Sequence, residues 1–241
     1  MDTSRKAQTG LGLRAEDYVA AAAKSLVGAV PFAGSLLVEI AGTIIPNQRL
    51  DRIAAFARNL EAKLAALERD FVRSQLTNES FTDLMEEGLR QAAQSLSDER
   101  REQIASLIAN SLDTTQVSYS DSKHLLRVLG ELNDVEVIRL AWYQHETMGE
   151  GSDFWERHKA ILDPVNATFG AAQAEIDRET LQVSYDAHLQ QLGLLKPHYN
   201  VDRKTGQVQI GISGDLEIGN HSLSSFGQLL LRHVGILDPA E

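Results

Sequence analysis

The sequence predicts a mainly α-helical protein, built as a helical bundle followed by a small C-terminal α+β module. Apolar residues recur at helical spacing over most of the chain up to residue 192, and strand-like alternation begins only after Pro197. Apolar residues make up 43% of the 241 positions, which is enough for a substantial core. We therefore divide the chain into an N-terminal tail (1–16), a helical bundle (17–132) and a C-terminal module (133–241).

The most regular stretch of the bundle is residues 47–76, which we expect to form one heptad helix. Its apolar residues alternate at spacings of three and four, and charged residues fill the positions between them. The apolar positions are Leu50, Ile53, Ala57, Leu60, Leu64, Leu67 and Phe71. A helix with one apolar stripe needs a partner, so we expect this stripe to pack either against neighbouring helices of the chain or against a second copy of the chain.

Capping patterns predict where several other helices begin and end. Ser80 with Asp83, Ser97, and Asn133 with Glu136 each precede an apolar periodic run, as N-caps do. Residues 47–112 are therefore expected to form three antiparallel helices. A longer amphipathic helix is predicted over 171–192 and ends at Gly193, in the position of a left-handed cap.

The N-terminal part of the bundle contains a nearly uncharged segment, residues 25–46. Pro31 and Phe32 interrupt it, Gly34 is one of several small residues that permit close backbone approach, and Glu39 is its only charge. Pro31 and Glu39 disfavour one continuous membrane span, so we expect a hairpin of two short helices. This hairpin is either buried in the bundle or able to insert into a membrane.

The C-terminal module carries the strand signals. Residues 198–201 and 207–212 alternate apolar and polar side chains around the turn sequence DRKTG, which predicts a β-hairpin with Gly206 at the positive-φ position. Residues 216–218 are a candidate third strand. A final helix is expected over 222–234, with Ser222 or Ser224 as its cap and Gly235 as its terminator.

Composition excludes several classes of function. There is no cysteine, which rules out disulfides, thiolate catalysis and cysteine-ligated metals. The formal charge is −11, which disfavours broad attraction to nucleic acid or anionic lipid. The seven histidines show no metal-binding spacing, and no phosphate loop or nucleophile elbow occurs. We therefore predict no enzymatic activity, no metal and no cofactor, and a cytoplasmic location, because charges interrupt any signal-peptide core at the N-terminus.

From Asn133 onward, the order of capped helices, a long helix ending in Leu192-Gly193-Leu194-Leu195, a β-hairpin and a Leu-x-x-x-Gly phrase resembles a winged-helix module. This resemblance implies either DNA binding or protein docking. Arg203 and Lys204 at the wing tip are the candidate contacts for a partner or for phosphate. The long helix offers only one arginine among four carboxylates, which favours protein docking.

Taken together, the hairpin, the segments SDERREQIASLIANSL and HLLRVLGELNDVEVIRLAW and the terminal module resemble the abortive-infection alpha proteins, small bacterial proteins linked to phage defence. The resemblance implies a non-enzymatic interaction protein, an effector whose hairpin engages the inner membrane. The expected partners are other proteins, a second copy of the chain or the membrane, with nucleic acid less favoured. The alternative is a winged-helix DNA-binding transcription regulator.

Overall fold

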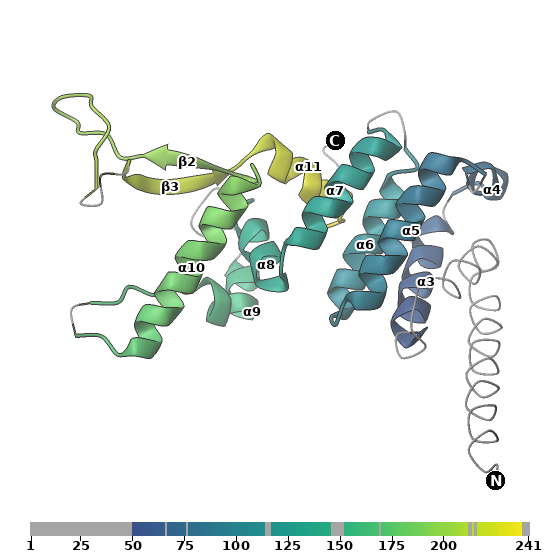
Figure 1. Ribbon diagram of the computed structural model, residues 1–241, viewed down its shortest axis with the longest axis horizontal. Helices are drawn as coiled ribbons and strands as arrows, with labels where there is room; N and C mark the ends of the chain where they lie inside the picture. Colours follow the sequence, from purple (N-terminus) through teal and green to yellow (C-terminus); the bar gives the residue numbers. More distant parts are fainter. Residues whose placement is uncertain are drawn as a thin grey trace, which may run out of the picture. The chain divides into compact units, whose positions relative to one another are not determined.

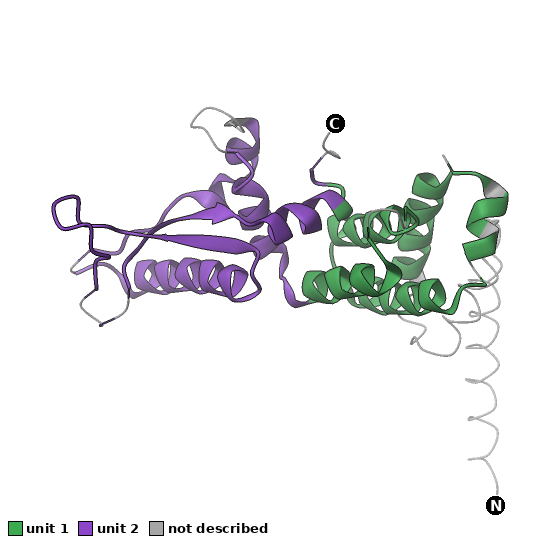
Figure 2. Cartoon of the chain, turned by 90° about the horizontal axis from the view of Figure 1, so that it is seen from above, with its two compact units in different colours: residues 1–130, 233–235 green, residues 131–232, 236–241 purple. Residues whose placement is uncertain are grey.

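The computed structural model describes residues 50–65, 67–75, 77–113, 117–145, 152–168, 170–211, 214 and 216–237. The chain forms two compact units (Figure 2): the first comprises residues 1–130 and 233–235, and the second residues 131–232 and 236–241. The predicted tail and the hairpin at 25–46, with Pro31, Phe32, Gly34 and Glu39, lie outside the described residues. The described chain is mainly helical with a small sheet near its C-terminus, which confirms the predicted class at that level.

The first unit is a helical bundle of α3 (Leu50–Leu64), α4 (Arg69–Gln75), α5 (Glu79–Gln94), α6 (Asp98–Asn110) and α7 (Tyr119–Glu131), shown in Figure 1. In it, α3 packs on α5 and α6, and these two also pack on each other. The apolar core is drawn from α3, α5, α6 and α7 and includes Ile53, Phe56, Leu60, Phe81, Leu84, Met85, Leu89, Ile104, Leu107, Ile108, Leu125, Leu126 and Leu129.

The single heptad helix predicted over 47–76 is wrong, because the structure has two helices there, α3 and α4. The α-helical bonding of α3 ends with the bond from Ala65 N to Glu61 O, and a tighter bond from Leu67 N to Leu64 O follows. In α4, Val72 is buried, whereas Phe71 is exposed. Because the helix is interrupted between α3 and α4, the buried positions of α4 do not continue the three-and-four spacing of α3. A heptad pattern that assumes one continuous helix cannot show this interruption.

The predicted caps are confirmed except at α5. Ser97 accepts a hydrogen bond from Arg100 N at the start of α6, as expected. At α5 the cap is Asn78 and not Ser80: its side-chain oxygen accepts from Ser80 N at 2.9 Å, so Ser80 already lies in the first turn. Asparagine is as strong a cap as serine, so the earlier of the two residues begins the helix.

The second unit contains four helices and two strands among its described residues. They are α8 (Asp134–Trp142), α9 (Ser152–Leu162), α10 (Gln173–Gln191), β2 (Leu195–Tyr199), β3 (Ile218–Leu223) and α11 (Ser225–His233). α8 packs on α9 and α10, and α10 leads into β2 (Figure 1). The capping box at the start of α8 is complete, as predicted: Asn133 and Glu136 each bond the other's backbone N–H.

The turn between α10 and β2 matches the predicted left-handed cap. Gly193 has φ +73, Leu194 N donates to Leu189 O, and Gly193 N donates to Gln190 O. These two bonds form a Schellman motif, which satisfies the last carbonyls of the helix. Leu194 and Leu195 are buried immediately after it, so the first strand starts from the core of the unit.

The sheet pairs β2 with β3 in antiparallel order, from Leu195 opposite Leu223 to Tyr199 opposite Ile218. The predicted hairpin of 198–201 with 207–212 forms only around its turn, where Val201 pairs with Val208, Asp202 N donates to Gln207 O and Gln209 N donates to Asn200 O. The main partner of β2 is β3, which the sequence did not predict. The final helix begins at Ser225 and not at Ser222, because residues 218–223 are taken by β3. Ser224 is its cap, since its hydroxyl accepts from Gly227 N at 2.9 Å.

Candidate interaction surface and its scaffold

We call residues 195–223 the arm: its described residues comprise β2, β3 and part of the segment between them (Figure 1). Beyond the strands, two isolated antiparallel bridges continue the pairing, from Val201 to Val208 and from Ile210 to Leu216. The outer part of the arm thus consists of three short extended segments, residues 199–201, 208–210 and 216–218. Each segment pairs with both of the others.

The backbone bonds of this outer part close a ring. Asn200 N donates to Glu217 O, Glu217 N donates to Gln209 O, and Gln209 N donates to Asn200 O, all at 2.8–2.9 Å. The Asn200 side chain also donates to the Glu217 carboxylate at 3.0 Å. The central residue of each segment is therefore polar, and the three are joined to one another.

The residues that flank these three are all apolar. Because successive side chains of an extended chain point to opposite faces, and paired residues point to the same face, the flanking residues share one face of the arm. We call it the apolar face; it consists of Tyr199, Val201, Val208, Ile210, Leu216 and Ile218. Their exposed fractions lie between 40% and 66%. Contiguous apolar surface of this kind is typical of interaction sites.

Arg203 and Lys204 lie in the turn that joins the first two segments. The turn is held by Asp202, whose carboxylate accepts from Lys204 N at 2.7 Å and from Thr205 N at 3.2 Å. Gly206 has φ +71, as the sequence predicts for this turn. Both basic residues are exposed, and they lie in the chain between Val201 and Val208, which pair with each other. The structure therefore places them at one end of the apolar face.

The inner end of the arm is fixed to α11. Ser224 N donates to Leu194 O at 3.0 Å, and the Ser224 hydroxyl donates to Gly193 O at 2.6 Å. A Cβ at Gly227 would lie 2.4 Å from Leu194 O, so only glycine allows the helix to approach this strand so closely. The Leu-x-x-x-Gly phrase thus has a packing role at the root of the arm.

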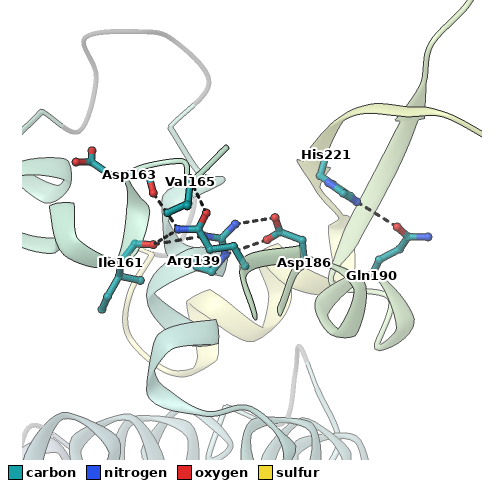
Figure 3. A network of polar contacts seen from close by, with 8 residues as sticks. Arg139, Ile161, Asp163, Val165, Asp186, Gln190 and His221 are labelled. Atoms are coloured by element: carbon teal, nitrogen blue, oxygen red, sulfur yellow. Dashed lines mark hydrogen bonds and ion pairs between the residues drawn. The ribbon is translucent and has the colours of Figure 1, made fainter. Parts of the chain in front are cut away.

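A polar network joins α8 to α10 beneath the arm (Figure 3). Arg139 makes a bidentate pair with Asp186, with Nε to Oδ1 at 3.0 Å and Nη2 to Oδ2 at 2.6 Å. Both side chains are largely buried. The Gln182 side chain donates to Asp163 O at 2.8 Å and accepts from Val165 N at 3.0 Å. These contacts hold the segment after α9 against α10.

Two further groups extend this network. Burial, together with the negative charge of Asp186 and a hydrogen bond to it, raises the pKa of Tyr143 to about 12, against the lowering effect of Arg139. Glu136, which caps α8, also meets His188 Nδ1 at 2.7 Å, so one carboxylate joins the start of α8 to α10. The network therefore holds α10, and with it the arm, in a defined position on α8.

The sequence indicated only part of this site. It placed Arg203 and Lys204 at a turn, and it showed the alternation of residues 198–201 and 207–212. It offered residues 216–218 as a third strand but did not reveal that they complete the same face, because alternation does not show which segments pair. The roles of Arg139, Tyr143 and Asp186 were also missed, since no local motif links residues on different helices.

Comparison of the chain with family models, curated proteins and solved structures finds no match. Within the described ranges, no cluster of three or more histidine, aspartate or glutamate side chains is arranged to hold a metal ion. No helix in those ranges combines the length and apolar character needed to cross a membrane.

Proposed function

We propose that this chain is a non-enzymatic interaction protein that associates with a second copy of itself through the apolar face of the arm. The observation that carries the proposal is the position of six exposed apolar residues on one face of a narrow, uncovered β structure. An isolated β ribbon is marginally stable in water, and it gains stability when its apolar side is covered.

Charge makes the arm the place where a second copy is least repelled. The whole chain carries −11, and like chains of high charge repel one another. The arm, in contrast, contains three basic residues (Lys196, Arg203, Lys204) and three acidic residues (Asp202, Asp215, Glu217). Contact between two arms therefore joins the electrically balanced parts of two acidic chains. A two-fold axis lets the same face serve on both copies.

The experiment is sedimentation equilibrium of the wild-type chain over a range of concentrations. We expect the apparent mass to rise from 26.5 kDa toward twice that value as concentration increases. Ile210→Glu introduces a charge on the apolar face and should abolish this rise. Val183→Glu, on α10, is a matched control because the two side chains are exposed to nearly the same degree, 66% and 64%.

Two outcomes would contradict the proposal. The first is a wild-type mass that stays at the monomer value at every concentration. The second is an Ile210→Glu variant that dimerises as well as wild type. Thermal melting of each variant establishes that it is folded, and substitutions at such exposed positions normally change stability little.

For the biological process, we propose phage defence in bacteria, on the resemblance described from the sequence. The proposed membrane engagement by residues 25–46 belongs to this part of the proposal. Phage yield in a host that expresses the wild-type chain or Ile210→Glu tests the process. If dimerisation is needed for defence, wild type should lower the yield and Ile210→Glu should not.

The winged-helix regulator is the alternative that the sequence left open, and the winged-helix assignment itself stays a prediction. DNA readers place basic side chains along a recognition helix. The corresponding helix, α10, carries one arginine and four carboxylates. Arg203 and Lys204 are the basic residues at the arm's tip. We therefore place protein binding ahead of DNA binding.

A further inference from the structure

A cavity of about 500 Å³ lies beside β3 in the second unit. Four consecutive residues of that strand line it: Asn220, His221, Ser222 and Leu223. Successive residues of a strand point to opposite faces, so a cavity on one face of the sheet would be lined by alternate residues of both strands. None of the residues of β2, all of which the structure describes, lines the cavity. The cavity therefore runs along the outer edge of β3.

The register of the sheet shows which backbone groups of β3 face this cavity. Ser224 N donates to Leu194 O, so these two residues form a hydrogen-bonded position of the ladder. Such positions alternate with non-bonded ones in an antiparallel pair, and Leu223 is therefore at a non-bonded position. His221 is at the next one, opposite Pro197, which has no N–H to offer. The N–H and C=O groups of His221 and Leu223 consequently point away from β2.

These outward groups of His221 and Leu223 have no backbone hydrogen bond to any residue that the structure describes. An edge strand with unpaired N–H and C=O groups is a template on which a further strand can pair. The opposite edge of the sheet is less suitable, because Pro197 removes one of the outward donors of β2. An added strand is therefore expected at β3 and not at β2.

The wall opposite β3 comes from the end of α8 and from α11 with the residues after it. Trp142 is the last residue of α8, and Tyr143 follows it. The Tyr143 ring meets the His221 ring edge-on, with centroids 6.3 Å apart, so Tyr143 lies on the face of the sheet to which His221 points. Aromatic rings at this position can pack against apolar side chains of an added strand. Four residues of β3 span about 13 Å, which sets the length of strand that the cavity can hold.

The two faces of the strand define the side chains that suit this site. Residues of an added strand that lie beside His221 and Leu223 face the aromatic wall, where apolar side chains fit. Residues that lie beside Asn220 and Ser222 share the other face with these two polar side chains. The chain carries −11, which repels an acidic peptide and favours an uncharged or basic one.

We propose that the outer edge of β3 binds an extended peptide segment of another protein as a third, antiparallel strand. The segment alternates apolar and polar side chains and contains no acidic residue. Backbone bonds to His221 and Leu223 supply affinity, and contact of the apolar side chains with Trp142 and Tyr143 supplies specificity. The site shares no residue with the apolar face of the arm, so it is independent of the self-association proposed above.

The probe is a short peptide of alternating valine and threonine, acetylated and amidated at its ends, with one lysine at each end. Both residue types favour extended backbone. Trp142 lines the cavity and Trp155, the only other tryptophan, packs against it, so tryptophan fluorescence of the full chain reports binding. Calorimetry is a second measurement. We expect saturable binding by wild type and equally by Ile210→Glu, whose substitution alters only the apolar face of the arm.

Methylation of the peptide's backbone nitrogens tests the pairing itself. In an antiparallel ladder, the peptide residues opposite His221 and Leu223 direct their N–H groups to β3, and the alternate residues direct theirs away. The valines occupy the first set of positions, because their side chains fit the aromatic wall. A peptide that is N-methylated at its valines should therefore bind about tenfold more weakly, or worse, because its hydrogen bonds to β3 are lost. A peptide that is N-methylated at its threonines is the matched control and should bind nearly as the unmodified peptide does.

A proline substitution tests the same hydrogen bonds from the side of the protein. His221→Pro removes the outward N–H and leaves the pairing with β2 intact, as Pro197 already does on the opposite strand. It should weaken binding of the unmodified peptide about tenfold. His221→Val keeps the N–H and is the matched control, which should bind nearly as wild type does. Thermal melting establishes that each variant is folded.

Several results would overturn the proposal. One is no saturable binding of the unmodified peptide by wild type. Another is a folded His221→Pro variant that binds as tightly as His221→Val. A third is a valine-methylated peptide that binds as tightly as the threonine-methylated one, and this comparison decides the matter if His221→Pro does not fold. The last is an affinity that falls as the concentration of Ile210→Glu rises, because a second copy would then occupy the edge of β3.

Discussion

Asp186 on α10 is the shared partner of Arg139 and Tyr143 in the polar scaffold of the second unit. It forms the bidentate pair with Arg139 and stabilises the neutral form of Tyr143 by accepting its hydrogen bond. A largely buried carboxylate is stable only when it is paired in this way. The cost of burial therefore explains why an arginine, a tyrosine and an aspartate from two helices meet at one point.

Because of this environment, we expect the stability of the protein to fall as the pH rises through the alkaline range. The pKa of Tyr143 is about 12 in the folded protein, against an ordinary value of 10.0. The unfolded chain therefore loses this proton first, so the stabilising contribution is complete below about pH 10 and is lost as pH rises to about 12. We expect Tyr143→Phe to reduce the loss of thermal stability over that interval.

Melting temperatures of wild type and Tyr143→Phe at a series of pH values measure this effect, with tyrosinate absorbance as a direct readout. Equal losses of stability in the two proteins between pH 10 and 12 would show that Tyr143 does not titrate as the structure indicates.

At the scale of single elements, α3 is the centre of the first unit. Ile53, Phe56 and Leu60 are fully buried on one of its faces, where α5 and α6 pack against it. The heptad pattern predicted this helix as far as Leu64 and the burial of Ile53, Ala57, Leu60 and Leu64. It did not include Phe56, which is also fully buried. Local capping patterns likewise located the starts of α6 and α8, because caps depend only on residues close together in the chain.

Leu60→Ala tests the role of α3 in the core. Leu60 has no exposed surface, so its truncation should leave a cavity and lower the free energy of unfolding by about 2–5 kcal/mol. Leu67→Ala, at an exposed position beyond the end of α3, is the control and should cost much less. Chemical denaturation of both variants measures the difference. A Leu60→Ala variant as stable as the control would remove α3 from the core.

The sequence was least informative where pairing is not local. Residues 198–201 and 207–212 have the alternation and the turn of a hairpin, yet β2 pairs mainly with β3. The ring of bonds among Asn200, Gln209 and Glu217 shows why, since each segment is shared between two partners. Alternation shows which face a side chain occupies, but it does not show which segments lie side by side.

At the scale of the whole molecule, the proposed interaction joins two copies through the apolar face of the arm. The apolar core of the first unit and the polar scaffold of the second unit each stabilise the folded state of a single chain. The apolar face is different, because its side chains stay exposed although they are arranged on one side. We propose that a second arm covers this face and thereby joins the two copies.

Site-specific cross-linking tests this claim most directly, because the chain contains no cysteine and a single introduced thiol is unique. Val208→Cys places a thiol on the apolar face, and Leu96→Cys places one at a residue of the first unit that is 83% exposed. Treatment with a short bis-maleimide should yield covalent dimers with Val208→Cys, and excess cysteine-free wild type should suppress them. A yield with Val208→Cys no greater than that with Leu96→Cys would contradict self-association through the arm.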